Sequence, residues 1–469
     1  MCNVESAVMD LRLTLAIITG KLITFIINLI AKSGGATTAP GLYALKIDPK
    51  LIEKLSKQVK YGSVLITGTN GKTTTARLAY DILSTKFKII HNRQGSNLLR
   101  GIASTLLQKA SIFGELKTNL AIWEVDEATF PEAAKILQPE IVVLLNLMRD
   151  QLDRYGEVDS LRIKWQAAIT KLPRKTTLIL NADDPGVSFL ANSHTGKTIF
   201  FGINTDKINL PQITNVADIK HCLNCHSKLS YSNLLTAHMG HYQCPNCKFK
   251  RPSPQVFAQN LQFKPDFSTQ IDLTLNSQLL NLNYKLPGLY NAYNILGSAT
   301  IANALSIESI KIKRSIESFS AAFGRFQKIK IGNKQTIIFL IKNPAGANEV
   351  LRTIAQKKRL SILAILNDNI ADGRDVSWIW NTDWEILTPK IKQMAVSGIR
   401  AWDLATRLKY AGIKLSNKNV NKDINYSIIH CLGNLDTKDT LLILPTYTAL
   451  LDVQKSLNKK GAIIKWQKQ

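Results

Sequence analysis

The sequence lacks long runs of like charge, low-complexity segments and internal repeats, so no part of it stands out as a nucleic-acid-binding tail. Acidic residues are scarce: 34 stand against 60 lysines and arginines, which gives a formal net charge of +26. This excess favours an anionic partner, such as a nucleic acid, a membrane surface or a phosphorylated substrate. The alternative is a lysine-rich surface spread over many helices. With 469 residues and 45% hydrophobic content, the chain is long enough for two or three globular domains.

Cysteine is also rare, and four of the six cysteines form two C-x-x-C pairs separated by eighteen residues. This spacing is typical of a zinc ribbon in a reducing compartment rather than of a disulfide framework. It predicts an insertion over about 219–252 in which four thiolates hold a structural Zn²⁺, namely Cys222, Cys225, Cys244 and Cys247. Nearby histidines could replace one cysteine: His221, His226, His238 and His241.

One long apolar run lies near the N-terminus. Leu11–Ile30 has the length of a membrane span, but Arg12 and Lys21 interrupt it. We therefore expect 1–44 to be an apolar or amphipathic segment that packs on the globular body or lies at a membrane surface, rather than crossing the membrane.

Short apolar strands alternate with helical stretches in the following part of the chain. The expected strands are Ser63–Gly68, Leu120–Val125, Glu140–Asn146, Thr177–Asn181 and Thr198–Phe201; the expected helices include Lys72–Thr85 and Phe130–Leu137. This order predicts a doubly wound parallel α/β sheet, in which ligands bind at the carboxyl ends of the strands.

The stretch GTNGKTTT follows the first of these strands and is typical of a phosphate-binding loop. Glycines let backbone N–H groups approach phosphate oxygens at the helix N-terminus, lysine reaches the terminal phosphates, and a threonine hydroxyl suits Mg²⁺. The candidate nucleotide-binding residues of this loop are Gly68, Thr69, Asn70, Gly71, Lys72, Thr73 and Thr74. At the end of a neighbouring strand lie Glu124, Asp126 and Glu127, of which one is expected to hold the magnesium.

The motifs GTNGKTTT, WEVDEATF, NLMRDQLDRYGE, NADDP and LPGLYNAYN, in that order, resemble the central ATPase domain of the Mur ligase superfamily. Those enzymes convert a carboxylate into an acyl phosphate with ATP, and an amine then attacks it. The resemblance implies a central ATPase domain over 45–320, with Lys72 as a catalytic phosphate contact and with Thr73 and Glu124 as magnesium ligands. It also implies further nucleotide contacts from Asn181, Asp183, Asp184, Asn291, Asn294 and Arg325.

Two positions depart from that pattern. Relatives that add amino acids carry a histidine where this chain has Gln151, which leaves a second magnesium site open. Lys164 lies near the position of a carbamylated lysine in some relatives, but its spacing is loose.

The C-terminal strings KNPAGANEVL, DGRDVSWIW and LPTYTAL, together with the cysteine ribbon, resemble the MurT family, the Mur-ligase-like subunits of lipid II isoglutaminyl synthases. The resemblance implies a smaller α/β C-terminal domain of this type over 321–469. It also implies ATP-dependent amidation of the D-glutamate α-carboxylate of lipid II, in the cytoplasm at the inner face of the plasma membrane. Ammonia would come from a glutamine amidotransferase partner of the GatD type in a heterodimer, and no nucleic acid would take part.

The same resemblance implies that an aspartate in DGRDVSW completes the catalytic site of the partner. Asp372 and Asp375 are the candidates, and we favour Asp375 because the Val-Ser-Trp after it starts an ordered segment, whereas Asp-Gly favours a turn. Two other functions stay open at this point. One is a Mur-type ligase that adds an amino acid to a UDP-linked or folate-like acid, and the other is an ATP-switched zinc protein that binds nucleic acid.

Overall fold

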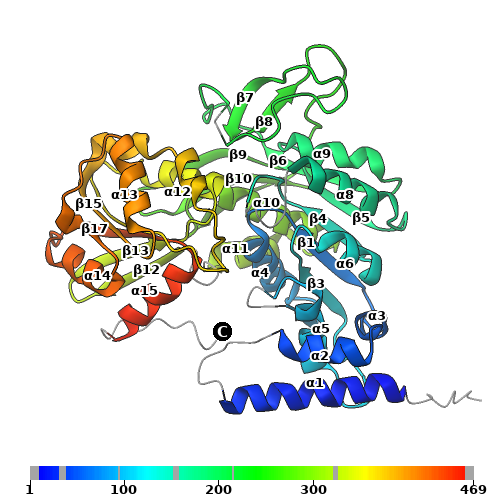
Figure 1. Ribbon diagram of the computed structural model, residues 1–469. Coiled ribbons are helices and arrows are strands. Elements are labelled where there is room, and N and C mark those ends of the chain that lie inside the picture. The colour runs from blue at the N-terminus through cyan, green and yellow to red at the C-terminus, as the bar shows by residue number, and fades with distance from the viewer. Residues whose placement is uncertain are drawn as a thin grey trace, which may run out of the picture.

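A computed structural model describes residues 10–30, 38–92, 96–150, 158–213, 216–320 and 326–459. Figure 1 shows two α/β units side by side, a small β-hairpin at the top and one long helix lying across the bottom. The larger unit is built on a nine-stranded sheet and the smaller, C-terminal unit on a six-stranded sheet.

The nine-stranded sheet has the order β11-β10-β9-β6-β5-β4-β1-β3-β2. All neighbours from β9 to β2 are parallel, and β9, β10 and β11 are antiparallel. The strands are β1 (Ser63–Thr67), β2 (Ile89–His91), β3 (Leu120–Glu124), β4 (Ile141–Leu144), β5 (Thr177–Asn181), β6 (Thr198–Ile203), β9 (Val256–Phe263), β10 (Thr269–Leu275) and β11 (Gln278–Tyr284). The predicted doubly wound parallel sheet is therefore confirmed, with every expected strand in place.

Helices cover both faces of this sheet because alternate residues of its buried strands point to opposite sides. Val64 and Ile66 face a core with α4 (Lys72–Leu83), α10 (Leu289–Ala304) and α11 (Ser309–Ser318). Leu65 faces the other core, which contains α5 (Leu99–Lys109), α6 (Phe130–Leu137) and α8 (Val158–Thr170). The short α9 (Pro185–Phe189) and η1 (Leu190–Ser193) follow β5.

Three N-terminal helices extend the second of these cores: α1 (Leu11–Ile30), α2 (Ala39–Ile47) and α3 (Leu51–Ser56). Leu13, Ala16 and Ile17 of α1 are buried against this body, so α1 packs along it, as Figure 1 shows at the bottom.

The cysteine-containing insertion lies between β6 and β9. Its hairpin, β7 (Ser230–Thr236) and β8 (Met239–Gln243), stands above the sheet in Figure 1.

The C-terminal sheet has the order β12-β13-β17-β14-β15-β16 and is parallel except for the β12–β13 pair. Its strands are β12 (Phe326–Ile331), β13 (Lys334–Phe339), β14 (Leu360–Ile365), β15 (Ile391–Ser397), β16 (Val420–Asn421) and β17 (Thr440–Pro445). On one face lie α12 (Pro344–Ile354), α13 (Ala401–Tyr410), η2 (Ser377–Asn381) and η3 (Trp384–Lys390); on the other lie α14 (Ile424–Gly433) and α15 (Tyr447–Lys459). The one-turn η4 (Asn417–Asn419) precedes β16.

Candidate active site

The phosphate-type loop connects β1 to the N-terminus of α4 in a conformation that requires glycine. Gly68 has a φ of +138° and Gly71 a φ of +92°, a region that L side chains rarely adopt. A Cβ on Gly71 would lie 2.1 Å from Asn294 Oδ1 on α10. The loop is therefore pressed against α10, and Thr74 is buried within the first turn of α4.

The segment after β4 holds this loop in shape. Asn146 O accepts from Thr69 N at 3.0 Å, while the Asn146 side chain pairs with the backbone of Asn70 at 2.8 and 2.9 Å. The Thr69 hydroxyl donates to Met148 O and accepts from Met148 N, both at 2.9 Å. Because these bonds fix both sides of the loop, it needs little rearrangement to receive an anion at the start of α4.

Lys72 is buried at the first position of α4. Its Nζ lies 2.7 Å from Gly68 O and 3.0 Å from Glu127 Oε2. Burial alone lowers the pKa of Lys72, but the carboxylates of Glu127, Asp150 and Glu124 outweigh it, and the pKa is raised. Burial also raises the pKa of Glu127. The lysine is thus a charged group that can exchange its bond to Glu127 for a bond to phosphate.

The second polar pair of the site is Thr73 with Glu124. The Thr73 hydroxyl donates to Glu124 Oε1 at 2.7 Å, and Asn92 holds the backbone of Glu124 on both sides at 2.8 Å. A hydroxyl and a carboxylate this close are oxygen ligands of the kind Mg²⁺ takes beside a nucleotide. Asp126 accepts from Ala128 N within its own turn, so of these two carboxylates Glu124 fits the metal better.

Three of the further nucleotide contacts implied by the resemblance, Asn181, Asp183 and Asp184, are fully buried. Asp183 accepts from Arg251 at 2.6 Å and from the hydroxyl of Tyr293 at 2.8 Å. Asp184 caps α9 and accepts from the backbone after β4 at 2.8 Å, and Asn181 donates to the same segment at 2.9 Å. To contact a nucleotide directly, these side chains would have to break their present hydrogen bonds. Those bonds link them to the ribbon, to α10 and to the segment after β4 that supports the loop.

The remaining candidates divide into three groups. Asn291 and Asn294 lie on the first turns of α10 and are bonded to each other at 3.1 Å, and Asn294 lies next to Gly71. Lys164 is exposed on α8. Arg325 and Gln151 lie outside the described residues.

The C-terminal unit reaches the loop through two residues before α12. Asn343 Nδ2 lies 3.0 Å from Asn70 Oδ1 and 3.2 Å from Asp150 Oδ1, and its Oδ1 caps α12. Lys342 Nζ lies 2.6 Å from Asp150 Oδ2. Burial raises the pKa of Asp150, but Lys342, Lys72 and Asn343 outweigh it, and the pKa is lowered. The two units therefore share one charged site.

The cysteine pairs converge in the ribbon. All four sulfurs, those of Cys222, Cys225, Cys244 and Cys247, lie within 4.8 Å of one another. Four thiolates around one Zn²⁺ lie about 3.8 Å apart, so the cluster matches a tetrahedral zinc site in donor type and spacing. The backbone N–H groups of Asn224 and Asn246 point at Cys222 and Cys244 from 3.4 Å, as suits thiolates. Within the described part of the chain, no histidine joins this group.

The two aspartates of DGRDVSW lie in different surroundings. Asp372 is buried and accepts from the backbone N–H of Thr448 at 2.8 Å as well as from its hydroxyl. Burial raises the pKa of Asp372. Asp375 is exposed, and Ser377 holds it through backbone and hydroxyl bonds of 2.8 and 2.9 Å. Asp372 thus supports the start of α15, whereas Asp375 presents an oriented carboxylate at the surface.

Comparison with known proteins agrees with this arrangement. The Mur ligase middle domain matches residues 66–302, and the MurT ligase C-terminal domain matches residues 340–450. The lipid II isoglutaminyl synthase (glutamine-hydrolyzing) subunit MurT of Staphylococcus aureus (strain COL) is 34% identical over 90% of this chain and 93% of its own length. The chain belongs to the MurT family. The MurT subunit of Streptococcus pneumoniae (strain ATCC BAA-255 / R6) is 32% identical over 97% of this chain and 99% of its own length.

Solved structures support the fold. A pseudomurein peptide ligase type C from Methanothermus fervidus superposes with a TM-score of 0.66 at 24% identity, covering 86% of this chain and 80% of that one. The middle-domain match and the MurT relatives show that the chain is an enzyme of the Mur ligase superfamily. Its MurT-type C-terminal region contains both Asn343 and the DGRD segment.

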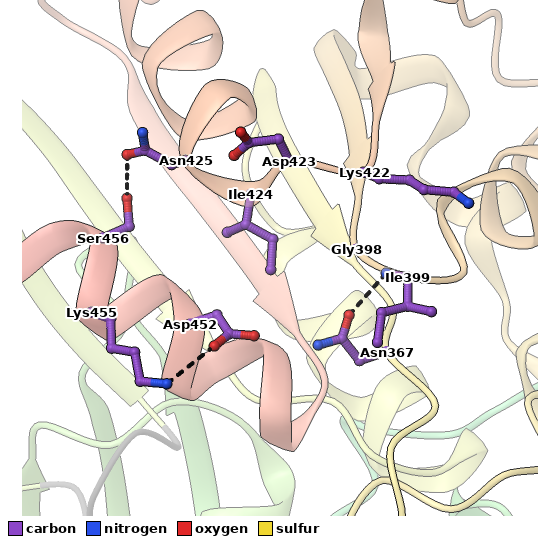
Figure 2. A pocket seen from close by; sticks show the side chains of 10 residues that line it. All are labelled: Asn367, Gly398, Ile399, Lys422, Asp423, Ile424, Asn425, Asp452, Lys455 and Ser456. Carbon is purple, nitrogen blue, oxygen red and sulfur yellow. Dashed lines mark hydrogen bonds and ion pairs between the residues drawn. The ribbon is translucent and has the colours of Figure 1, made fainter. Parts of the chain in front are cut away.

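A cavity of about 410 Å³ lies at the carboxyl edge of the MurT-type sheet, beyond the ends of β14, β15 and β16. Figure 2 shows the Lys455–Asp452 ion pair on one side and Asn367 bonded to the backbone of Ile399 on the other. Asn367 also donates to the Thr448 hydroxyl at 3.1 Å, which links the cavity wall to the support of Asp372. The cavity and the DGRD segment thus belong to one edge of the C-terminal unit.

The sequence motifs did not identify the residues that support the loop or connect it to the C-terminal unit: Asn146, Asp150, Lys342 and Asn343. An Asn-Pro pair before a helical stretch signals an N-cap and so marks Asn343 as the start of α12. Its bond to Asn70 joins positions 273 residues apart, and the local sequence pattern does not indicate this contact.

Proposed function

We propose that this chain is the ligase subunit of a glutamine-hydrolysing lipid II isoglutaminyl synthase. It uses ATP to activate the D-glutamate α-carboxylate of lipid II and replaces it with a carboxamide. The supporting observation is the match to MurT subunits over almost the whole length of both chains, together with a preformed phosphate-type loop. We also propose the domain division 1–44, 45–320 and 321–469 for this enzyme.

The reaction needs two anions to meet. A carboxylate oxygen attacks the γ-phosphorus of ATP, ADP leaves, and ammonia then attacks the acyl carbon and displaces phosphate. Lys72, released from Glu127, neutralises charge on the transferring phosphoryl group. Thr73 and Glu124 would hold Mg²⁺, which adds positive charge to the phosphates when it is bound. Asn294 lies beside Gly71 and is bonded to Asn291, and both amides would contact the nucleotide there.

The partner subunit supplies ammonia from glutamine. We place its docking surface on the edge of the C-terminal unit that carries Asp375, because large apolar side chains are exposed there: Ile370, Ile399 and Trp402. Asp375 would orient a histidine of the partner, in the way a buried aspartate orients the base of a Cys–His or Ser–His pair. The expected GatD-type amidotransferase fits this arrangement.

The ribbon has a structural role in this proposal. Zn²⁺ bound by the four cysteines ties its two knuckles together, and His238 and Arg251 connect the ribbon to Asp184 and Asp183 beneath it. The competing amino-acid-adding function finds less support, since the C-terminal region matches MurT rather than a domain that binds an amino acid.

One assay separates the candidate functions. The chain is purified with a glutamine amidotransferase subunit, and ATP hydrolysis and the product mass are measured with lipid II plus glutamine, lipid II plus ammonium, amino acids with a UDP-linked acid, or nucleic acid. We expect ATP turnover and an amidated product only in the first two mixtures. Turnover that depends on an amino acid, or on nucleic acid, would overturn the proposal.

A further inference from the structure

Helix α1 has a continuous face of exposed apolar side chains. Its large exposed side chains recur every three or four residues and therefore lie on one side of the helix: Leu11, Leu15, Ile18, Leu22, Phe25, Ile26 and Leu29. Leu11, Phe25 and Leu29 are 70%, 61% and 69% exposed. Because twenty helical residues span about 30 Å, this stripe is much longer than a scattered surface contact.

The opposite side of α1 is firmly attached to the protein. A Cβ on Gly20 would lie 2.6 Å from Leu107 of α5, so the two helices are in close contact. Arg12 donates to Ile47 O at 2.6 Å, and Asp10 pairs with Lys54 at 2.6 Å. The segment is apolar enough to cross a membrane by composition and length. Crossing would, however, break these contacts and expose the buried side of α2 and α5.

A neighbouring loop extends the apolar face. Gly114 packs against Leu13 and Ile17 of α1, which brings the preceding Ile112 and Phe113 beside the helix. Both are exposed, by 51% and 65%. Two separate segments thus present large apolar side chains to solvent.

The segments at and next to α1 carry mainly positive charge. Residues 10–30, 38–60 and 108–117 contain nine basic side chains and four acidic ones. Lys21 lies on α1 itself at the flank of the stripe, where its stem can follow the apolar surface and its ammonium can reach a charged headgroup. Two copies of this face placed together would bring like charges into contact, whereas an anionic surface complements them.

We propose that α1 binds the surface of an anionic lipid bilayer, with its axis parallel to the membrane plane and the stripe in the headgroup–acyl boundary. The basic side chains around it contact anionic headgroups. This surface is separate from the phosphate loop and does not depend on the proposed ligase activity. It would hold the enzyme against the membrane in which a lipid-linked substrate resides.

The test is flotation of the full chain, bound to its partner subunit, with vesicles that contain no lipid II. We expect binding to vesicles of phosphatidylglycerol and phosphatidylcholine, weaker binding to phosphatidylcholine alone, and release by alkaline carbonate. The double variant Leu22→Glu/Phe25→Glu should lower the vesicle partition coefficient by roughly tenfold or more.

A matched control places the same charges elsewhere. Ile163→Glu/Leu279→Glu changes two exposed apolar side chains, one on α8 and one on β11 at the sheet edge opposite to β2. This control should bind vesicles as the unchanged chain does. The proposal would be overturned if both double variants lost vesicle binding equally, or if the unchanged chain did not bind vesicles at all. A dimer that the α1 variant alone converts to monomer in light scattering would also overturn it, since the stripe would then be a self-association surface. Resistance to carbonate would indicate a spanning helix instead.

Discussion

At the scale of single residues, the active site depends on groups that hold one another in place before any nucleotide arrives. Lys72 keeps its charge in a buried position because three carboxylates surround it. Its carboxylate partner, Glu127, lies 3.0 Å away, and burial raises the pKa of Glu127, which favours the protonated form of this group. The lysine is therefore free to transfer its bond to a phosphate without leaving a buried charge unpaired.

Lys72→Ala and the more conservative Lys72→Met should abolish amidation. We expect turnover to fall by at least about 100-fold, because the charge is needed as the phosphoryl group transfers. Turnover with ammonium as the nitrogen source measures this, and circular dichroism and partner binding report on the fold. Lys175→Ala removes an exposed lysine paired with Glu140 and serves as the control. Near-normal turnover in Lys72→Met would show that the phosphate site is elsewhere.

Asp375→Asn should separate the two half-reactions. An amide cannot fix the histidine tautomer as a carboxylate does, so glutamine-dependent amidation should fall by about 10²–10⁴-fold while amidation fed with high ammonium persists. Asp372→Asn is the matched control: Asp372 already accepts two bonds from Thr448, so its loss should lower the melting temperature and reduce both activities together. If Asp375→Asn retains glutamine-dependent activity, or loses both activities, the assignment to the partner site is wrong.

Local sequence was sufficient for the residues whose role is set by their immediate neighbours. The string GTNGKT after an apolar strand predicts a glycine turn, and Gly68 and Gly71 do have positive φ angles. Glu124 at a strand end was expected beside Thr73, and the two are hydrogen-bonded. In contrast, the complete burial of Asp183 depends on Arg251, 68 residues away in the insertion. A contact of that kind follows from the packing of distant segments, which no short motif records.

At the scale of elements, the strands predicted from continuous apolar runs all form because parallel strands are buried on both faces. Strands whose residues alternate between buried and less buried positions were not predicted from the sequence. These are β9, β10 and β11, which pair antiparallel with one another at one end of the sheet. The amphipathic character of α1 was expected, but which of its faces packs on α5 depends on Gly20 and Leu107.

The ribbon leads to a prediction about metal. We expect about one Zn²⁺ per chain in protein purified without chelator, because four convergent thiolates match a closed structural site. Cys225→Ser should lose the metal and lower the melting temperature, since metal binding is coupled to folding of the ribbon. Elemental analysis and thermal denaturation measure both effects. Cys431→Ser, which changes a buried cysteine of α14 far from the cluster, should keep the metal. A Cys225→Ser protein with full zinc, or one that is fully stable and lacks only catalysis, would contradict the structural role.

At the scale of the whole molecule, the two α/β units meet at the phosphate-type loop. Asn343 bonds to Asn70 of the loop and to Asp150, and Lys342 pairs with the same aspartate. Above this junction, Thr236 of the ribbon donates to Glu349 of α12 at 2.7 Å. The position of the C-terminal unit is therefore linked both to the loop and to the insertion, so a change at the junction should alter catalysis without unfolding either unit.

Asn343→Asp tests this link. The aspartate keeps an acceptor for Gly346 N and so still caps α12, but it loses the amide donor to Asn70 and places a like charge beside Asp150. We expect ammonium-fed amidation to fall by roughly 10- to 100-fold, because small displacements in a reacting geometry are costly, while the free energy of unfolding changes by less than about 1 kcal/mol.

Asp423→Ala is the control. It removes the cap of α14 within the C-terminal unit, so it should lower stability by a similar or larger amount and leave ammonium-fed turnover intact. If both variants slow turnover equally, the effect comes from general destabilisation. If Asn343→Asp retains full turnover, the contact between the units does not position the loop for phosphoryl transfer.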